Sequence, residues 1–131
     1  MKTIPYSRQY IDSQDVRFVS KALKKNLITT GNYVKKFENQ TKKLLQSKFA
    51  ISCSSGSAGL HLAMKAINIK NNDIIIMPAI NFIAVYSITR TLGAKIFLAD
   101  VDPFTGQMTP KTLIECIQKN KLKKIKAIVT M

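Results

Sequence analysis

From Phe49 to the end of the 131-residue chain, short apolar runs alternate with segments of helical periodicity. The runs are too short for helices, and the one at 73–77 holds three consecutive isoleucines, which is typical of a strand buried on both faces. The pattern predicts strands over 49–53, 73–77, 95–99 and 125–131, and helices over 58–69, 82–92 and 110–119. Strands that alternate with helices in this way indicate an α/β fold with a mostly parallel sheet flanked by helices.

The first 48 residues show a different pattern, which predicts an N-terminal arm followed by helices. Asp12 is a good N-cap for a first helix, and Ile11 and Val16 occupy the positions of a hydrophobic staple around it. A loop over 27–32 leads to a second helix with one apolar face, which we expect to pack inward. We therefore divide the chain into 1–48 and an α/β part over 49–131. We expect the α/β part to be incomplete, because the chain stops within an apolar strand.

The turn Ser54–Ser57 joins the first predicted strand to the helix that follows it. All four residues are small, so their backbone N–H groups allow a close approach. Free amides and the positive end of a helix dipole point the same way at such a turn, which favours an anion. The alternative is an ordinary strand-to-helix turn with a serine N-cap. The usual dinucleotide and P-loop fingerprints are both absent.

The net charge of +14 raises the question of nucleic-acid binding. Only Arg8, Arg17 and Arg90 among the 21 basic residues are arginine, and the lysines are distributed over helix faces and turns. The densest lysine run, 119–126, contains no aromatic side chain that could stack on bases. We therefore favour a solvated lysine-rich surface and expect no nucleic-acid partner, although such a surface also attracts phosphorylated small molecules.

The remaining composition indicates where such a protein functions. No apolar run approaches the roughly 20 residues of a membrane helix, and the N-terminus lacks the apolar segment of a secretory signal. Cys53 and Cys116 are isolated and lack the spacing of metal ligands. These features predict a reduced, cytoplasmic protein without membrane association and without a metal site.

Five segments in order along the chain resemble one family. They are IPYSRQYI, NLITTG with Phe37 and Glu38 downstream, SSGSAGLHLA, MPAINFIA and GAKIFLADVDPFTGQM. Together they resemble the DegT/DnrJ/EryC1/StrS sugar aminotransferases, which are pyridoxal 5'-phosphate enzymes of the aspartate-aminotransferase fold. The resemblance implies that residues 49–131 belong to the cofactor-binding large domain. The first segment and the run DPFTGQMTP are most similar to the branch that aminates a UDP-4-keto-6-deoxy-hexosamine on the way to pseudaminic acid.

The resemblance implies cofactor-binding roles for Gly56, Ser57 and Phe82. Gly56 and Ser57 match the positions whose amides and hydroxyl hold the cofactor phosphate, with serine in place of the more usual threonine. Phe82 matches an aromatic ring that stacks on the cofactor, a contact that orients the ring and leaves its reactive end free. The alternative for Phe82 is a core residue on the first turn of an amphipathic helix. Because the ends of parallel strands share one sheet edge, we expect the turn and Phe82 to face one cavity.

The resemblance also implies a substrate-binding loop close to the dimer partner. Its residues are Thr29, Thr30 and Gly31. His61 lies one turn into a helix, where packing or a hydrogen bond is a better interpretation than catalysis. Asp100 and Asp102 end a strand and match positions that are structural in the family.

The family's lysine that binds the cofactor covalently, and the aspartate that pairs with the pyridine nitrogen, lie downstream of this sequence. We therefore assign no catalytic residue here and expect an N-terminal fragment that is inactive alone. The implied activity is glutamate-driven amination of a nucleotide-linked 4-keto-6-deoxy sugar by a homodimer. The alternatives are a pyridoxamine-dependent sugar dehydrase of the same family and a basic α/β module that binds phosphate or nucleic acid.

Overall fold

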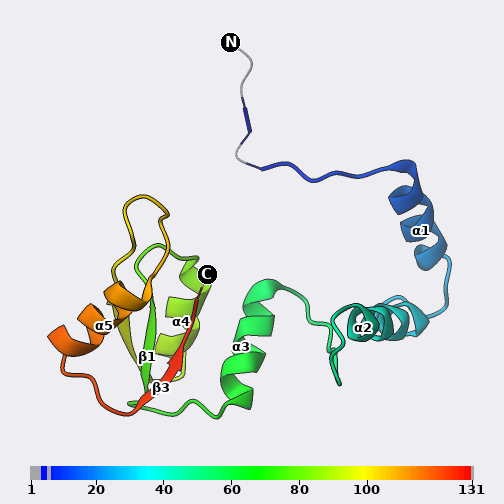
Figure 1. Ribbon diagram of the computed structural model, residues 1–131. Helices are drawn as coiled ribbons and strands as arrows, with labels where there is room; N and C mark the ends of the chain where they lie inside the picture. The colour runs from blue at the N-terminus through cyan, green and yellow to red at the C-terminus, as the bar shows by residue number, and fades with distance from the viewer. Residues whose placement is uncertain (1–3, 6, 131) are drawn as a thin grey trace. The chain divides into compact units, whose positions relative to one another are not determined.

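The structure is a computed structural model that describes residues 4–5 and 7–130. The chain divides into two compact units between Ser52 and Cys53, and each unit is described by itself. The first unit holds helices α1 (Ser13–Leu23) and α2 (Asn32–Leu44). The second unit is an α/β unit whose elements are labelled in Figure 1. In order they are α3 (Gly56–Ala66), β1 (Ile74–Pro78), α4 (Ile83–Thr91), β2 (Lys95–Ala99), α5 (Pro110–Lys119) and β3 (Ile125–Ile128).

Helix α1 begins where the sequence predicts. The Asp12 carboxylate accepts hydrogen bonds from the amides of Gln14 and Asp15, and the Asp15 carboxylate accepts one from the amide of Asp12. This reciprocal cap satisfies N–H groups that the first turn of a helix leaves free, so the predicted N-cap is confirmed.

The prediction that the apolar face of α2 packs inward is wrong for most of that face. Neither α1 nor α2 buries a residue, and Phe37, Leu44 and Leu45 of α2 are exposed. Helical periodicity predicts an apolar stripe but does not determine whether another part of the protein covers it. The described residues leave these side chains exposed.

The predicted strand over 49–53 is also absent. These residues have irregular backbone, and the side chains of Phe49 and Ile51 are 72% and 80% exposed. A strand requires a partner for its backbone groups, and no ladder forms along these residues within the described chain. The apolar run therefore identified a segment of the right composition without determining its pairing.

The other three predicted strands form a parallel sheet in the order β2-β1-β3. Strands β1 and β2 pair in register from Ile74 opposite Lys95 to Pro78 opposite Ala99. The pairing of β1 with β3 contains an irregularity after Ile74, which moves the next pair to Ile75 and Ala127. The predicted α/β fold with a parallel sheet is confirmed. Strand β3 ends earlier than predicted, and Met131 lies outside the described residues.

Helices cover both faces of this sheet (Figure 1). On one face, Ile75 and Met77 of β1 pack with Met64 of α3 and Val85 of α4. On the opposite face, Ile76 packs with Cys116 of α5, and burial raises the pKa of the Cys116 thiol. Alternate side chains of β1 thus enter two cores, as the run of isoleucines predicts.

Two helix boundaries of this unit follow from local chemistry. Helix α5 begins with a reciprocal cap between Thr109 and Thr112 and with Pro110 at its first position. Gly93 ends α4 at a φ of +76°, and a Cβ added there would lie 2.7 Å from the Asn71 side-chain oxygen. Glycine is therefore required at this turn both by its conformation and by the available space.

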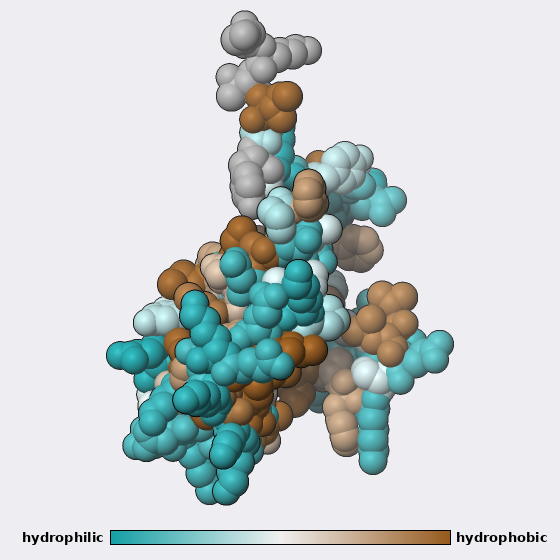
Figure 2. Space-filling view, turned by 60° about the vertical axis from the view of Figure 1, so that its left-hand side comes forward, coloured by the Kyte–Doolittle hydropathy of each residue, from teal (hydrophilic) through white to brown (hydrophobic). Residues whose placement is uncertain are grey.

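Figure 2 shows hydrophilic side chains over much of the visible surface, with hydrophobic side chains between them. In the described part of the chain, no helix combines the length and the apolar character needed to cross a bilayer.

Candidate functional site

The turn before α3 has two unused backbone donors. Ser55 is the N-cap, and its hydroxyl accepts a hydrogen bond from the amide of Ala58 at 3.1 Å. Within residues 4–5 and 7–130, the amides of Gly56 and Ser57 have no hydrogen-bond partner. They occupy the first two positions of an 11-residue helix, where backbone N–H groups point along the axis toward its N-terminus. An anion at this end would accept hydrogen bonds and meet the positive end of the dipole.

The space in front of Gly56 is open. A Cβ added to Gly56 would meet no heavy atom within 4 Å, and residues 54–57 are all exposed. Two free amides beside open space fit a phosphate group, which needs several donors at short range. The ordinary N-cap also exists, on Ser55, so the two interpretations of this turn are compatible.

Phe82 is exposed, not part of the core. Its side chain is 69% exposed at the N-cap position of α4, so the interpretation of Phe82 as a core residue is wrong within this chain. The Asn81 side-chain oxygen accepts a hydrogen bond from the Phe82 amide at 2.7 Å, which fixes the chain just before the helix. Phe82 follows the carboxyl end of β1, the sheet edge at which parallel α/β folds bind ligands. Its stacking role and its distance from Ser57 remain predictions.

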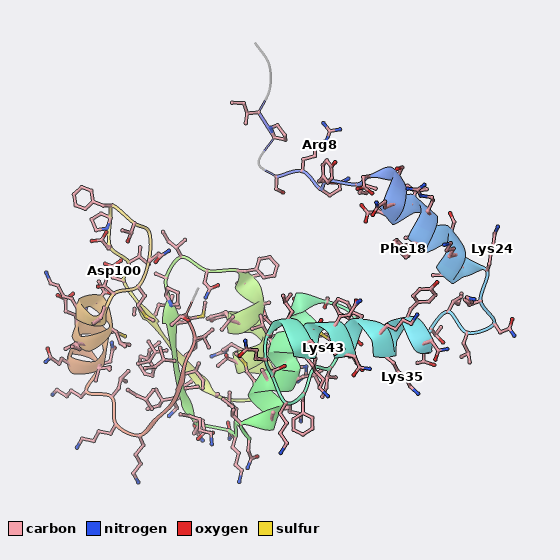
Figure 3. All side chains as sticks on the ribbon, turned by 45° about the vertical axis from the view of Figure 1, so that its right-hand side comes forward. Arg8, Phe18, Lys24, Lys35, Lys43 and Asp100 are labelled. Carbon is pink, nitrogen blue, oxygen red and sulfur yellow. The ribbon has the colours of Figure 1, made fainter. Side chains whose placement is uncertain are left out.

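Asp100 and Asp102 follow the carboxyl end of β2 at the same edge, and Figure 3 labels Asp100. The Asp102 carboxylate accepts hydrogen bonds from the amides of Phe104 and Thr105 and from the Thr105 hydroxyl. The bond from the Thr105 amide is the main reason that the pKa of Asp102 lies below its ordinary value. Asp102 thus stays charged to hold a turn, as its expected structural role requires.

A cavity of about 500 Å³ in the second unit lies between β2 and α5. Its lining includes Leu98, Asp100, Glu115 and Cys116 but not Gly56, Ser57 or Phe82. It is therefore a different feature from the predicted phosphate site.

The predicted substrate loop lies in the first unit, between α1 and α2. Thr29 and Thr30 are exposed, whereas Gly31 is half-buried and is the N-cap of α2. Gly31 also lines a cavity of about 470 Å³ whose other residues include Lys24, Lys25 and Tyr33. Figure 3 shows Lys24 at the end of α1. The sequence predicted only that the lysines are distributed over helix faces and turns, because the place of these two in a cavity depends on the path of the loop between α1 and α2.

His61 is exposed, and no hydrogen bond joins it to another described residue, so the expectation that it is packed is wrong here. Among the residues that the structure describes, no group of three histidine, cysteine or acidic side chains is arranged to hold a metal ion.

A parallel α/β unit with free backbone amides at the start of α3 and with an exposed aromatic residue after β1 is typical of ligand-binding folds. Residues 9–131 match the DegT/DnrJ/EryC1/StrS aminotransferase family. The chain therefore belongs to this family, and the family resemblance and fold class inferred from the sequence are confirmed.

Three similar proteins extend this result. The chain is 31% identical over 130 residues to GDP-perosamine synthase of Escherichia coli O157:H7, covering 98% of this chain and 35% of that protein. It is 30% identical to the aminotransferase from Psychrobacter cryohalolentis, with a TM-score of 0.82 over 96% of this chain and 32% of that one. It is 28% identical to the E. coli GDP-4-keto-6-deoxy-D-mannose-3-dehydratase with bound hydrated PLP, with a TM-score of 0.86 over 99% and 34% of the two chains. The chain thus spans about a third of the length of these relatives.

Proposed function

We propose that this chain supplies the phosphate-binding part of a pyridoxal 5'-phosphate-dependent aminotransferase that acts on a nucleotide-linked 4-keto-6-deoxy sugar. The observation that carries the proposal is the pair of free amides at Gly56 and Ser57, which face open space in a chain that belongs to a sugar aminotransferase family.

The residues at this end of α3 fit the cofactor phosphate. The amides of Gly56 and Ser57 and the Ser57 hydroxyl would donate to the phosphate oxygens, and the absence of a side chain on Gly56 leaves room for them. Phe82 would stack on the cofactor ring and exclude water from one face of it. When bound, the cofactor supplies the electron sink for amino-group transfer, and the chain's own contribution is binding and orientation.

The substrate that we propose is more specific than the family assignment. IPYSRQYI and DPFTGQMTP support a UDP-4-keto-6-deoxy-hexosamine as acceptor, with pseudaminic acid as the destination and glutamate as the amino donor in a ping-pong reaction. Thr29, Thr30 and Gly31 would contact the sugar nucleotide, and the lysines of the adjoining cavity would favour its phosphates. The relative named for GDP-perosamine makes a GDP-linked sugar the main competitor.

A pyridoxamine-dependent sugar dehydrase is the second candidate. It is favoured by the similarity to the GDP-4-keto-6-deoxy-D-mannose-3-dehydratase, which is 28% identical. The two activities share the phosphate site. The dehydrase removes an oxygen from the sugar, whereas the aminotransferase adds an amine to it.

We further propose that the whole protein is a cytoplasmic homodimer. The exposed apolar faces of α1 and α2 are compatible with burial in an assembly.

The test is amino transfer by the whole protein supplied with pyridoxal 5'-phosphate, glutamate and a UDP-4-keto-6-deoxy-N-acetylhexosamine. We expect a 4-amino sugar and an equal amount of 2-oxoglutarate, both measured by mass spectrometry. The GDP-linked 4-keto-6-deoxy sugar is the matched control for the nucleotide. A deoxygenated sugar without an amine would establish the dehydrase instead, and no reaction with either nucleotide sugar would contradict both candidates.

A further inference from the structure

The carbonyl oxygen of Ser55 accepts two hydrogen bonds at the start of α3. The Gly59 amide donates to it at 3.0 Å, which is the first bond of the helix, and the Cys53 thiol donates to it at 3.3 Å. A carbonyl oxygen has two lone pairs, so both donors bind at once. Residues 53–59 all belong to the second unit, so these contacts lie within one compact part of the chain.

This carbonyl belongs to the same peptide group as the Gly56 amide. A trans peptide group is planar, and its C=O and N–H bonds point in opposite directions. The two donors that hold the Ser55 oxygen therefore also determine the direction of the Gly56 N–H, which points out of the N-terminal end of α3.

The thiol contact matters because the first turn of a helix is weakly restrained. Helix ends fray, and glycine loses more conformational freedom on folding than any other residue. The bond from Gly59 is part of the helix and is lost when its first turn opens, whereas Cys53 holds the same carbonyl from the segment before the helix. A peptide group that is held from both sides has less entropy to lose when its N–H binds a ligand.

Gly59 leaves the space that the Cys53 thiol occupies. A Cβ added to Gly59 would lie 3.2 Å from the Cys53 Sγ atom, which is closer than an ordinary van der Waals contact. Gly59 lies inside α3, where glycine lowers helical stability relative to alanine. Glycine at this position therefore costs helical stability and allows the thiol to reach the first turn.

We propose that Cys53 and Gly59 are positioning residues, which together orient the Gly56 amide for a phosphate group. Cys53 acts through its bond to the Ser55 carbonyl, and Gly59 acts by leaving room for that bond. The inference rests on the proposed function, since that function supplies the ligand. Both residues act through the Ser55–Gly56 peptide group, and neither is assigned a contact with the ligand.

The test compares variants of the whole protein. Cys53→Ala removes the thiol donor, and Cys53→Ser replaces it with a hydroxyl donor. Gly59→Ala fills the space beside the thiol. His61→Ala is the control, because His61 is an exposed residue of the same helix and its replacement by alanine also raises helical propensity.

The first readout is the peptide group itself. Isotope labelling of the serine carbonyl carbon and the glycine nitrogen selects the NMR signals of the Ser55–Gly56 peptide, the only Ser–Gly pair in the 131 residues. The second readout is the dissociation constant of pyridoxal 5'-phosphate, measured by absorbance, with pyridoxal as the ligand that lacks the phosphate. Urea denaturation measures the stability of each variant.

We expect Cys53→Ala to move both signals of this peptide group and to weaken pyridoxal 5'-phosphate binding by about two- to fivefold, the range that one lost weak hydrogen bond supports. Cys53→Ser should restore most of the affinity, and pyridoxal binding should change little in either variant. Gly59→Ala should weaken pyridoxal 5'-phosphate binding without lowering the urea midpoint, a combination that a merely structural role would not produce.

A double variant tests whether the two residues act together. Oxygen is smaller than sulfur, so the Cβ added by Gly59→Ala is less crowded in the Cys53→Ser background. Gly59→Ala should therefore weaken pyridoxal 5'-phosphate binding less in that background than in the wild type. Equal losses of affinity in the two backgrounds would overturn the role of Gly59.

The remaining outcomes separate this proposal from the proposed function. Unchanged signals of the Ser55–Gly56 peptide in Cys53→Ala would overturn the thiol contact. Changed signals with the affinity of the His61→Ala control would overturn the positioning role. A wild-type protein that binds pyridoxal 5'-phosphate no better than pyridoxal would overturn the proposed function, whereas the peptide signals would still report on the thiol contact.

Discussion

The two units of this chain use similar amphipathic helices with opposite results. Helices α1 and α2 carry clear apolar stripes and bury no residue, whereas β1, α3, α4 and α5 each contribute buried side chains to a core. The difference lies in partners, because the second unit has a sheet with two faces to cover, whereas the described residues of the first unit form no sheet. An apolar stripe therefore predicts a surface that requires burial, and the long-range pairing of strands determines whether that burial occurs.

The largest effect should separate two isoleucines. Ile76 of β1 is fully buried and Ile51 is 80% exposed, so truncation leaves a cavity only at Ile76. We expect Ile76→Ala to lower the free energy of unfolding of the second unit by about 2–5 kcal/mol, and Ile51→Ala to leave it within about 0.5 kcal/mol. Urea denaturation followed by the NMR amide signals of β1 measures both. Equal losses of free energy would mean that Ile51 is packed as Ile76 is, and would contradict the difference between the two units.

Gly93→Ala should be the next largest change. The substitution places a Cβ against Asn71 at a φ of +76°, which should cost about 1–3 kcal/mol. The expected result is a lower urea midpoint with an unchanged slope. Gly56→Ala is the control, because its Cβ would meet open space, and it should leave the midpoint nearly unchanged. A midpoint of Gly93→Ala equal to wild type would show that the turn rearranges freely.

The two reciprocal helix caps provide a matched pair. Loss of a cap typically costs about 1 kcal/mol, and Asp12 and Thr109 cap helices of similar length in the two units. Thr109→Ala should lower the cooperative unfolding midpoint of the second unit, whereas Asp12→Ala should lower helical circular dichroism without moving that midpoint. If Asp12→Ala shifts the midpoint as much as Thr109→Ala does, the two units unfold together.

The smallest effect concerns pH and the loop after β2. The pKa of Asp102 is lower in the folded chain than its ordinary value of 3.8, because of the Thr105 amide bond above all. A carboxyl group with a lowered pKa stabilises the fold above its ordinary pKa, and this contribution is lost as the pH falls through the folded value. We expect the amide signals of Phe104 and Thr105 to titrate below pH 3.8 and to lose this dependence in Asp102→Asn. A titration midpoint at or above 3.8 would contradict the hydrogen-bonded turn.

The features that the sequence predicted correctly are local. The cap at Asp12, the helix over 110–119 and the parallel sheet all follow from side chains within a few residues or from one repeated pattern. The strand over 49–53 was wrong because its pairing is a property of distant residues.

The site shows the same limit. The turn into α3 with free amides at Gly56 and Ser57 was predictable because it depends on neighbouring residues alone. The hydrogen bonds from the Ser52 amide and hydroxyl to the Glu38 carboxylate join residues that are fourteen positions apart, and such a contact leaves no periodic signal in the sequence. The exposure of Phe82 could not be read from its neighbours either, since the first turn of an amphipathic helix has the same composition at a core and at a site.

The central claim is that Gly56 and Ser57 bind a phosphate group, and the most direct measurement is the shift of their amide protons in an NMR titration. Pyridoxal 5'-phosphate and inorganic phosphate should both move these two signals downfield, pyridoxal should not, and Gly56→Val should abolish the response by filling the open space. A response confined to the lysines of 119–126, or one that pyridoxal reproduces, would contradict the claim.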